Sequence, residues 1–341
     1  MGFSKSELRN RLDNARRALG ELDALLVNGD ENVRYLTGVD TGRVLIWRSG
    51  ARFWLNEVYL DRAKGSPVKP EAYEKDCVKK FIISKRFRRV GIDSISLKEY
   101  KATEPELRKL LKPSDICAQL RKIKSKEELK LLARAGRIAA EVTSLIDESE
   151  ILGMSDFELS GLLEHEIRKR GSEKPSFGAG MLCQVGENSK YPHSPPTGRV
   201  VRDGDLVIID LGAVCQGYNS DMTRTLRIGN VSKEKSKIAD LTTWLKQEAI
   251  DRINVGGKIS EVHSFINKEI EKAGYKFAHL SGHGVGLEVH EKPSVGPDEK
   301  DLFQNGMVFT IEPGIYTASF GARSEDTIAL AGGKKRILTK Q

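Results

Sequence analysis

The sequence predicts a two-domain α/β (α+β) protein, with a smaller α/β domain over residues 1–120 and a larger domain over residues 121–341. Three observations support this fold class. The 341 residues exceed the ~250–300 at which a single hydrophobic core usually stops growing. Apolar runs of strand length alternate with amphipathic stretches of helix length. Pro113 and a run of mixed polar residues interrupt this pattern within 112–122, so we place the domain boundary there.

The first domain is expected to combine strands with short helices. Helix-like spacing near the amino terminus leads into the apolar run DALLV, which ends at Asn28-Gly29-Asp30. RVLIW and ARFWLNEV predict a hairpin whose turn contains Arg48-Ser49-Gly50. RRVGIDS predicts a further strand, and a short helix is expected after Thr103-Glu104-Pro105.

The second domain begins with two predicted helices and continues with two strand pairs. Ser125 with Glu128 and Ser155 with Glu158 form capping boxes, and Gly171 suits the residue after a helix end. DLVIIDLGAV and NSDMTRTLRI are expected to pair around the turn CQGY. Two more helices are expected at about 234–254 and 259–272. MVFTIEPGIY and ARSEDTIALA then form the second strand pair.

Composition argues against several classes of protein. The net charge of +8 comes from scattered basic residues, and a solvated edge or turn accounts for the one real cluster, 79–89. No nucleic-acid-binding signature accompanies that cluster, so no nucleic-acid partner is expected. The absence of both an apolar run of ~18 residues and a signal-peptide pattern predicts no membrane association and a cytoplasmic location. Four cysteines without a CxxC pair favour neither a zinc finger nor a disulfide framework.

Paired acidic residues mark both strand pairs of the second domain. A loop centred between Cys215 and Gln216 would set Asp210 directly opposite Asp221. Directly opposed residues have Cβ atoms ~4.5–5.5 Å apart, so two carboxylates there require a cation between them. Glu312 and Glu325 repeat the pattern across the second hairpin. Four carboxylates would gather at one place if the two hairpins met.

A glycine- and histidine-rich segment, SGHGVGLEVH, lies between the two strand pairs. It departs from the dinucleotide fingerprint because Leu287 stands where the third glycine is needed. We interpret Gly282, Gly284 and Gly286 as backbone that passes close to a metal, with His283 as a ligand. Carboxylates with one imidazole favour Mn, Co or Zn over copper or an iron–sulfur cluster. Two such ions can hold a hydroxide that attacks a carbonyl, so the residues predict metal-assisted hydrolysis.

At these motifs the chain resembles the pita-bread metallopeptidases: methionine aminopeptidase, aminopeptidase P and prolidase. The matching stretches are PHSPPTGRVVRDGDLVIIDLGAVCQGYNSDMTRT, HLSGHGVGLEVHE, FTIEPGIY and GARSEDT. DALLVNGDENVRYLTGVD resembles the extra amino-terminal domain of the proline-specific members. The resemblance implies a carboxy-terminal pita-bread domain with pseudo-two-fold symmetry, cleavage of Xaa-Pro bonds in short proline-containing peptides, and a homodimer. It also implies a creatinase-like amino-terminal domain that serves dimerisation and substrate access.

The resemblance also implies a role for each site residue. Asp210 would ligate one metal ion, His283 and Glu312 the other, and Asp221 and Glu325 would bridge the two ions, which are expected to be Mn or Co, with Zn as a further candidate. Glu312 would also act as general acid and base. His193 and His290 would hydrogen-bond the substrate or the tetrahedral intermediate. His279 is assigned either to substrate binding or to packing, and Arg323 would orient Glu325.

One departure leaves the substrate length open. Prolidases often carry Arg four residues after the histidine of the EVHE-like motif, where it holds the dipeptide carboxylate, and here Ser294 occupies that position. Both a dipeptidase and an aminopeptidase for longer Xaa-Pro peptides therefore stay open. Two other hypotheses keep the fold: a non-enzymatic protein- or nucleic-acid-binding member, and a creatinase-like amidinohydrolase. The complete set of five metal ligands counts against both.

Overall fold

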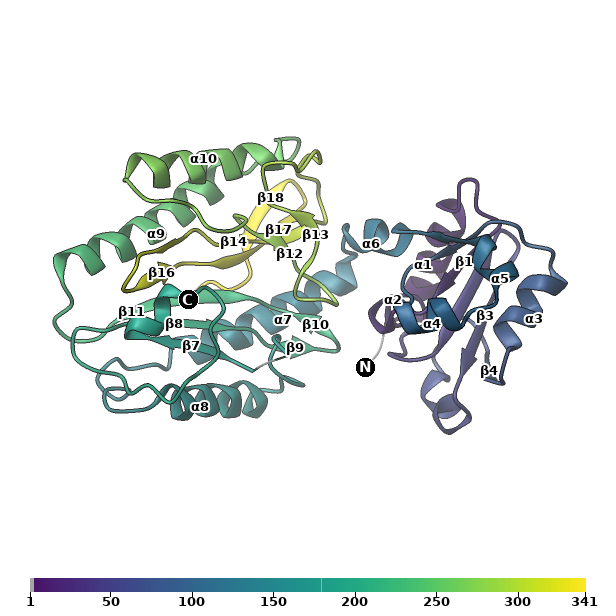
Figure 1. Cartoon of the computed structure of the whole chain (residues 1–341), viewed down its shortest axis with the longest axis horizontal. Helices are drawn as coiled ribbons and strands as arrows, with labels where there is room; N and C mark the ends of the chain where they lie inside the picture. The colour runs from purple at the N-terminus through teal and green to yellow at the C-terminus, as the bar shows by residue number, and fades with distance from the viewer. Residues whose placement is uncertain (1–2, 179) are drawn as a thin grey trace. The chain divides into compact units, whose positions relative to one another are not determined.

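The computed structural model describes residues 3–178 and 180–341, which fall into two compact units, Met1–Arg121 and Lys122–Gln341. Figure 1 shows mixed helices and strands in both units. Among the described residues, no helix is both long enough and apolar enough to cross a membrane. The four cysteines are all free, and Cys117, Cys183 and Cys215 are buried.

The amino-terminal unit is a six-stranded mixed sheet with helices on both faces. The strand order is β4-β3-β2-β1-β5-β6, with β1–β2 and β2–β3 antiparallel and the other neighbours parallel. Its strands are β1 Ala24–Val27, β2 Arg43–Trp47, β3 Gly50–Leu55, β4 Pro70–Ala72, β5 Val90–Ile92 and β6 Leu111–Pro113. Its helices are α1 Lys5–Arg17, α2 Asp30–Thr37, the 3-10 helix η1 Glu57–Ala63, α3 Cys77–Ser84, α4 Leu97–Ala102, α5 Pro105–Leu110 and α6 Ile116–Arg121.

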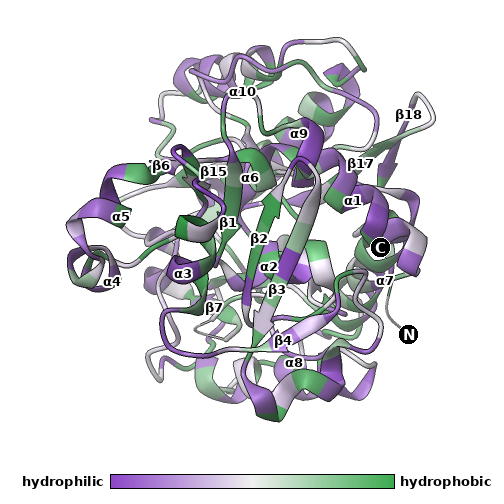
Figure 2. Cartoon of the chain, turned by 90° about the vertical axis from the view of Figure 1, so that its right-hand side faces the viewer, coloured by the Kyte–Doolittle hydropathy of each residue, from purple (hydrophilic) through white to green (hydrophobic). Residues whose placement is uncertain are grey.

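Strand alternation determines which helices cover each face of this sheet. Leu26, Leu45 and Trp54 point to one face and pack with Val78 and Ile82 of α3. Helices α1, α2 and α6 contact one another, and α1 also contacts β2. The hydrophobic colour along β1 and β2 in Figure 2 marks these central, buried strands. The basic cluster 79–89 begins within α3, contrary to the sequence expectation, but Lys85, Arg86, Arg88 and Arg89 follow the helix in an exposed turn, as expected.

The carboxy-terminal unit is built from two halves, each with a pair of helices and a core of its own. In the first half, α7 and α8 pack on the sheet β11-β8-β7. In the second half, α9 and α10 pack on the sheet β13-β12-β14-β17-β18. Figure 1 shows the strands lying between α8 on one side and α9 and α10 on the other. The helices are α7 Lys126–Thr143, α8 Asp156–Lys169, the 3-10 helix η2 Gly186–Lys190, α9 Lys233–Arg252 and α10 Ile259–Lys272.

The strands of this unit form ladders that are short and interrupted. Three form the first sheet, β7 Leu182–Val185, β8 Leu206–Leu211 and β11 Met222–Arg227. Five form the second, β12 His283–Gly284, β13 Glu291–Ser294, β14 Val308–Ile311, β17 Asp326–Ala331 and β18 Lys334–Ile337. Two small separate ladders extend the hairpins, β9 Val214–Cys215 with β10 Tyr218–Asn219, and β15 Gly314–Tyr316 with β16 Gly321–Arg323.

The predicted helix signals are confirmed. Ser125 and Ser155 both accept a hydrogen bond from the backbone N–H of the glutamate three residues on, and each glutamate returns a bond, so both capping boxes are complete. Gly171 directly follows Arg170, the C-cap residue of α8, and has a φ of +92°, which favours glycine. These signals were readable because each involves residues within one turn of helix.

Candidate metal centre

The first hairpin turns at Gln216-Gly217. Both residues have positive φ, +50° and +82°, as a type I′ turn requires. The turn is therefore centred one residue later than predicted, and the strands pair Asp210 with Thr223. The predicted direct opposition of Asp210 and Asp221 is wrong. Because the displacement is two residues, both side chains still belong to the same face, as diagonal neighbours.

The second hairpin has the predicted register. The β14–β17 ladder ends with Ile311 opposite Asp326, and the β15–β16 ladder begins with Gly314 opposite Arg323. The two ladders therefore share the same pairing register. Glu312 and Glu325 therefore oppose each other in the interval between the ladders, which confirms the predicted pairing.

The two hairpins meet at Thr223 and Thr225 of β11. The N–H of Glu325 donates to Thr223 O at 3.0 Å, and Thr223 Oγ1 donates to Glu325 Oε2 at 2.7 Å. The N–H of Arg323 donates to Thr225 Oγ1 at 3.0 Å, and that hydroxyl donates to Arg323 O at 2.8 Å. The carboxylates of the two halves therefore face one shared volume.

Three buried carboxylates each leave one oxygen unbound in this volume. Asp210 Oδ1, Asp221 Oδ1 and Glu325 Oε1 are buried and have no hydrogen-bond partner in the described part of the chain. The other oxygens of Asp210 and Glu325 are held by Arg323, at 2.6 Å, and by Thr223. Ligand atoms of Asp221, His283 and Glu325 lie within 4.8 Å of one another. Unpaired buried carboxylate oxygens are costly, and a divalent cation is the partner that fits them.

The electrostatics of the carboxylates point the same way. Burial raises the pKa of Asp221, and Glu325 and Asp210 raise it further. Burial likewise raises the pKa of Glu325, with Glu312 and Asp210 adding to the effect. The pKa of Glu312 rises to about 8, chiefly through burial. Like charges this close hold protons unless a cation is present between them.

His283 presents one ring nitrogen to the carboxylates. Its Nε2 lies 3.4 Å from Glu312 Oε1 and 3.6 Å from Asp221 Oδ2. Its Nδ1 lies 3.1 Å from Gly284 O, so a proton on Nδ1 can donate to that carbonyl. Burial lowers the pKa of His283 to about 3, which keeps the ring neutral. A neutral imidazole whose second nitrogen donates to a carbonyl is the usual arrangement of a metal-binding histidine.

Close packing of the backbone explains why positions 282 and 284, on either side of His283, are glycine, whereas the sequence analysis attributed them to a nearby metal. A Cβ on Gly282 would lie 2.0 Å from Thr310 O, and one on Gly284 would lie 2.2 Å from Lys292 O. The missing side chains therefore admit the neighbouring backbone of β14 and β13. Close approach of strands, rather than of a metal, accounts for these two glycines.

His279 lies beside Glu312 and contacts the hydroxyl of Tyr316. His279 Nε2 lies 3.1 Å from the Tyr316 hydroxyl, and its Nδ1 lies 2.7 Å from Leu280 O and 3.9 Å from Glu312 Oε2. Burial lowers the pKa of His279 to about 4. Sequence reasoning left the role of His279 open and missed Tyr316, although that residue ends the motif FTIEPGIY.

His290 and His193 lie at the edge of the carboxylate group. The His290 ring stacks at a tilt on the His283 ring, with centroids 4.1 Å apart. His193 is exposed in the segment after η2. Burial lowers the pKa of both histidines, and each also senses the charge of Asp210. Both rings are therefore neutral near pH 7 and can each donate one N–H.

Arg323 contacts the carboxylate of Asp210 directly and that of Glu325 only through another residue. The residue is only 1% exposed. Nη2 donates to Asp210 Oδ2, Nε donates to Thr223 Oγ1 at 3.1 Å, and Nη1 donates to the Tyr316 hydroxyl at 2.7 Å. Arg323 thus orients Asp210 by contact and reaches Glu325 only through Thr223. The sequence expectation that it orients Glu325 itself is corrected to that extent.

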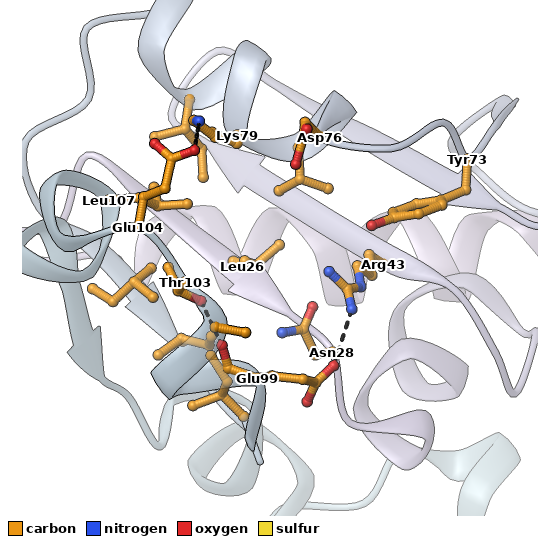
Figure 3. Close-up of a pocket in the computed structure, with 16 residues that line it drawn as sticks. Leu26, Asn28, Arg43, Tyr73, Asp76, Lys79, Glu99, Thr103, Glu104 and Leu107 are labelled. Carbon is orange, nitrogen blue, oxygen red and sulfur yellow. Dashed lines mark hydrogen bonds and ion pairs between the residues drawn. The ribbon is translucent and has the colours of Figure 1, made fainter. Parts of the chain in front are cut away.

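A separate pocket of about 270 Å³ lies in the amino-terminal unit (Figure 3). Leu26, Ile82 and Ile92 form part of its apolar floor. Arg43 on its rim pairs with Glu99 at 3.2 Å, and Lys79 pairs with Glu104. Both basic side chains are thus paired with acidic residues of α4 and of the start of α5 within this unit. We therefore assign the catalytic site to the carboxylates of the carboxy-terminal unit and not to this pocket.

Comparison with known proteins agrees with this geometry. Residues 130–331 match Metallopeptidase family M24, and residues 9–123 match the Creatinase/Prolidase N-terminal domain. The chain belongs to metallopeptidase family M24. The metallopeptidase is 31% identical over 328 residues to an Xaa-Pro dipeptidase of Pyrococcus horikoshii, covering 94% of this chain and 93% of the relative.

Solved structures resemble the metallopeptidase over nearly its whole length. A prolidase from Pyrococcus horikoshii OT3 has a TM-score of 0.90 at 30% identity, covering 97% of this chain and 98% of that one. An X-Pro aminopeptidase from Thermotoga maritima has a TM-score of 0.82 at 27% identity, covering 96% and 98%. The fold is thus the pita-bread domain preceded by a creatinase-type domain, and the family implies divalent metal ions.

Proposed function

We propose that this metallopeptidase hydrolyses the Xaa-Pro bond of short peptides with two divalent ions held by Asp210, Asp221, His283, Glu312 and Glu325. The unbound oxygens of three buried carboxylates, two of which (Asp221 and Glu325) group with His283, are the observation that carries the proposal. The Xaa-Pro specificity is supported by the dipeptidase and aminopeptidase relatives. We further propose Mn or Co as the ions, with Zn as a third candidate, since carboxylate-rich sites suit these metals.

The bound ions would polarise the scissile carbonyl and lower the pKa of a water molecule. The chain's own residues supply the proton transfers and the orientation. Glu312, half-buried beside His283 and His279, would accept the proton of the attacking water and pass it to the proline nitrogen that leaves. His193 and His290, both neutral, would donate hydrogen bonds to the substrate or to the oxyanion of the tetrahedral intermediate.

Chelation followed by reconstitution tests this function. After removal of metal, addition of Mn or Co should restore hydrolysis of Ala-Pro, while Ala-Ala should stay uncleaved. Activity that survives chelation, or equal cleavage of Ala-Pro and Ala-Ala, would contradict the proposal. The metal content of the active protein should approach two ions per chain, measured by elemental analysis.

A comparison of Ala-Pro with Ala-Pro-Ala decides between dipeptidase and aminopeptidase. Ser294 lies on β13 opposite His283, and its N–H donates to Glu299 Oε2 at 3.2 Å. The acidic Glu299 beside Ser294 disfavours a peptide carboxylate at this position. We therefore expect the tripeptide to be cleaved at least as fast as the dipeptide. The homodimer and the cytoplasmic location stay predictions, which light scattering and cell fractionation can check.

A further inference from the structure

Gln184 is a fully buried amide on the side of β7 that faces the carboxylates. The β7–β8 ladder pairs Leu182 with Asp210 and Gln184 with Ile208, so Gln184 shares a face with Asp210. The alternate residues Cys183 and Val185 point the other way, into the core beneath α7 and α8. A polar side chain is therefore placed two residues along the strand from the partner of Asp210.

The Gln184 side chain spans the two residues that flank His193. Its Nε2 donates to Pro192 O at 2.9 Å and approaches Ser194 O at 3.5 Å, the outer limit of a hydrogen bond. Pro192, Pro195 and Pro196 lack N–H groups, so this segment has few backbone donors with which to fix itself. His193 belongs to no helix or strand. Besides the backbone bond from the Ser194 N–H to Tyr191 O at 3.3 Å, side-chain donors hold the segment.

The same segment is tied to Asp210 through a second donor. Arg323 Nη1 donates to Pro192 O at 3.0 Å, while Arg323 Nη2 donates to Asp210 Oδ2. Pro192 O thus accepts from both Arg323 and Gln184. These contacts set the distance between the His193 segment and one of the carboxylates proposed to hold metal.

Stability does not account for a glutamine at this position. Gln184 is 0% exposed, and its Oε1 has no hydrogen-bond partner among the described residues. A buried carboxamide with an unpaired oxygen destabilises a fold relative to an apolar side chain of similar size. Residues that lower stability are characteristic of functional sites, where activity offsets that cost.

We propose that Gln184 is a positioning residue that holds the His193 segment in place for substrate binding and transition-state stabilisation. The inference rests on the proposed role of His193. It assigns Gln184 no contact with substrate or metal. Its effect on catalysis must therefore act through His193 and disappear when the imidazole of His193 is removed.

The variant Gln184→Met removes both N–H donors and keeps the length of the side chain. We expect kcat/KM for Ala-Pro to fall about tenfold, because a small displacement of a catalytic group is enough for such a loss. The thermal midpoint should stay equal or rise, since the unpaired amide oxygen is removed as well. Gln184→Leu should behave in the same way, and the exposed Gln247→Met should change neither quantity.

A double-mutant cycle with His193→Ala decides whether the two residues act together. We expect His193→Ala to lower kcat/KM by about a hundredfold. Adding Gln184→Met to that variant should change kcat/KM by less than about twofold, because coupled residues are not additive. Multiplying losses, or a Gln184→Met protein as active as wild type, would overturn the inference. If His193→Ala is fully active, the proposed role of His193 fails, and the inference fails with it.

A spectroscopic readout tests the inference without any catalysis. In protein with ¹³C-labelled histidine, the His193 ring signal should shift or broaden in Gln184→Met. The signal of His165, exposed on α8, should stay unchanged. An unchanged His193 signal would overturn the inference even if the chain cleaves no Xaa-Pro peptide.

Discussion

Asp221 combines the properties of a metal ligand most completely. It is 2% exposed, its Oδ1 has no partner in the described part of the chain, and its Oδ2 faces His283. The neighbouring carboxylates of Glu325 and Asp210 repel it, so burial and charge both oppose its ionised form. Such a residue weakens the metal-free fold and is expected to contribute favourably only when a cation is bound.

Asp221→Asn should therefore separate stability from activity. We expect hydrolysis to fall by more than the roughly 100-fold that the loss of a supporting hydrogen bond to a ligand can cost. The metal-free variant should gain about 1 to 3 kcal/mol in unfolding free energy, because Asn is neutral without the proton that buried Asp221 must take up on folding. Urea unfolding in chelator measures the gain, and the exposed Asp298→Asn serves as the matched control. A metal-free Asp221→Asn less stable than wild type would contradict this reading.

The raised carboxylate pKa values predict how metal affinity depends on pH. Burial raises the pKa of Glu312 from 4.5 to about 8, and a ligand must be deprotonated to bind. Metal binding should thus release protons, and affinity for Mn or Co should weaken as pH falls from 8 to 6. Calorimetry in buffers of different ionisation enthalpy measures the protons released. Affinity independent of pH would contradict the prediction.

The stability of the metal-free protein should show the matching pH dependence. The folded state holds a proton on Glu312 up to about pH 8, whereas the unfolded state loses it near 4.5. Between these values the folded state binds more protons, so the unfolding free energy should fall as pH rises through this window. Denaturation in chelator at several pH values measures this slope.

At the scale of elements, the turn Gln216-Gly217 sets the register of the first hairpin. Gln216 adopts a φ of +50°, which glycine and asparagine tolerate better than glutamine. Gly212, between β8 and β9, cannot carry a side chain, because a Cβ there would lie 1.9 Å from Ser220 O. Gln216 therefore carries backbone strain that another residue would relieve, whereas position 212 admits only glycine.

Two substitutions in this hairpin should shift stability in opposite directions. Gln216→Asn should raise the unfolding free energy by about 0.5 to 1 kcal/mol, since Asn-Gly suits a type I′ turn. Gly212→Ala should lower it by about 1 to 3 kcal/mol through the clash with Ser220 O. Denaturant titration measures both. Destabilisation by Gln216→Asn would contradict the turn assignment.

At the scale of the whole molecule, the two units have separate cores. One core of the amino-terminal unit centres on β1, β2 and α3, and the two cores of the carboxy-terminal unit flank the carboxylates. The proposed metal ligands, 210 to 325, belong to the unit Lys122–Gln341 alone. Bound ions should therefore stabilise this unit directly.

Chelation should consequently affect protection from hydrogen exchange unevenly. Ligand present at about 1,000 times its Kd stabilises a fold by about 4 kcal/mol, and its removal should expose amides of β8, β14 and β17. Amides of β1 and β2 should keep their protection. Hydrogen exchange followed by mass spectrometry, with and without chelator, measures both sets. Equal loss in both units would contradict the assignment of the ions to one unit.

The amino-acid sequence was enough to predict the starts of α7 and α8, the end of α8, and the acidic and histidine residues considered for the site, because capping boxes, glycine ends and motifs are local patterns. It did not indicate α2, α3 or β7. The register of the first hairpin was predicted wrongly from the sequence, because the positive φ at Gln216 is a property of the folded turn. The contacts of Arg323 with Asp210 and Pro192 required the tertiary structure, because they join segments 113 and 131 positions apart and form only when the two halves of the carboxy-terminal unit pack together. The contacts of Gln184 with Pro192 and of Arg323 with Tyr316 span only 8 and 7 positions, but they depend on side-chain directions that the folded strands set.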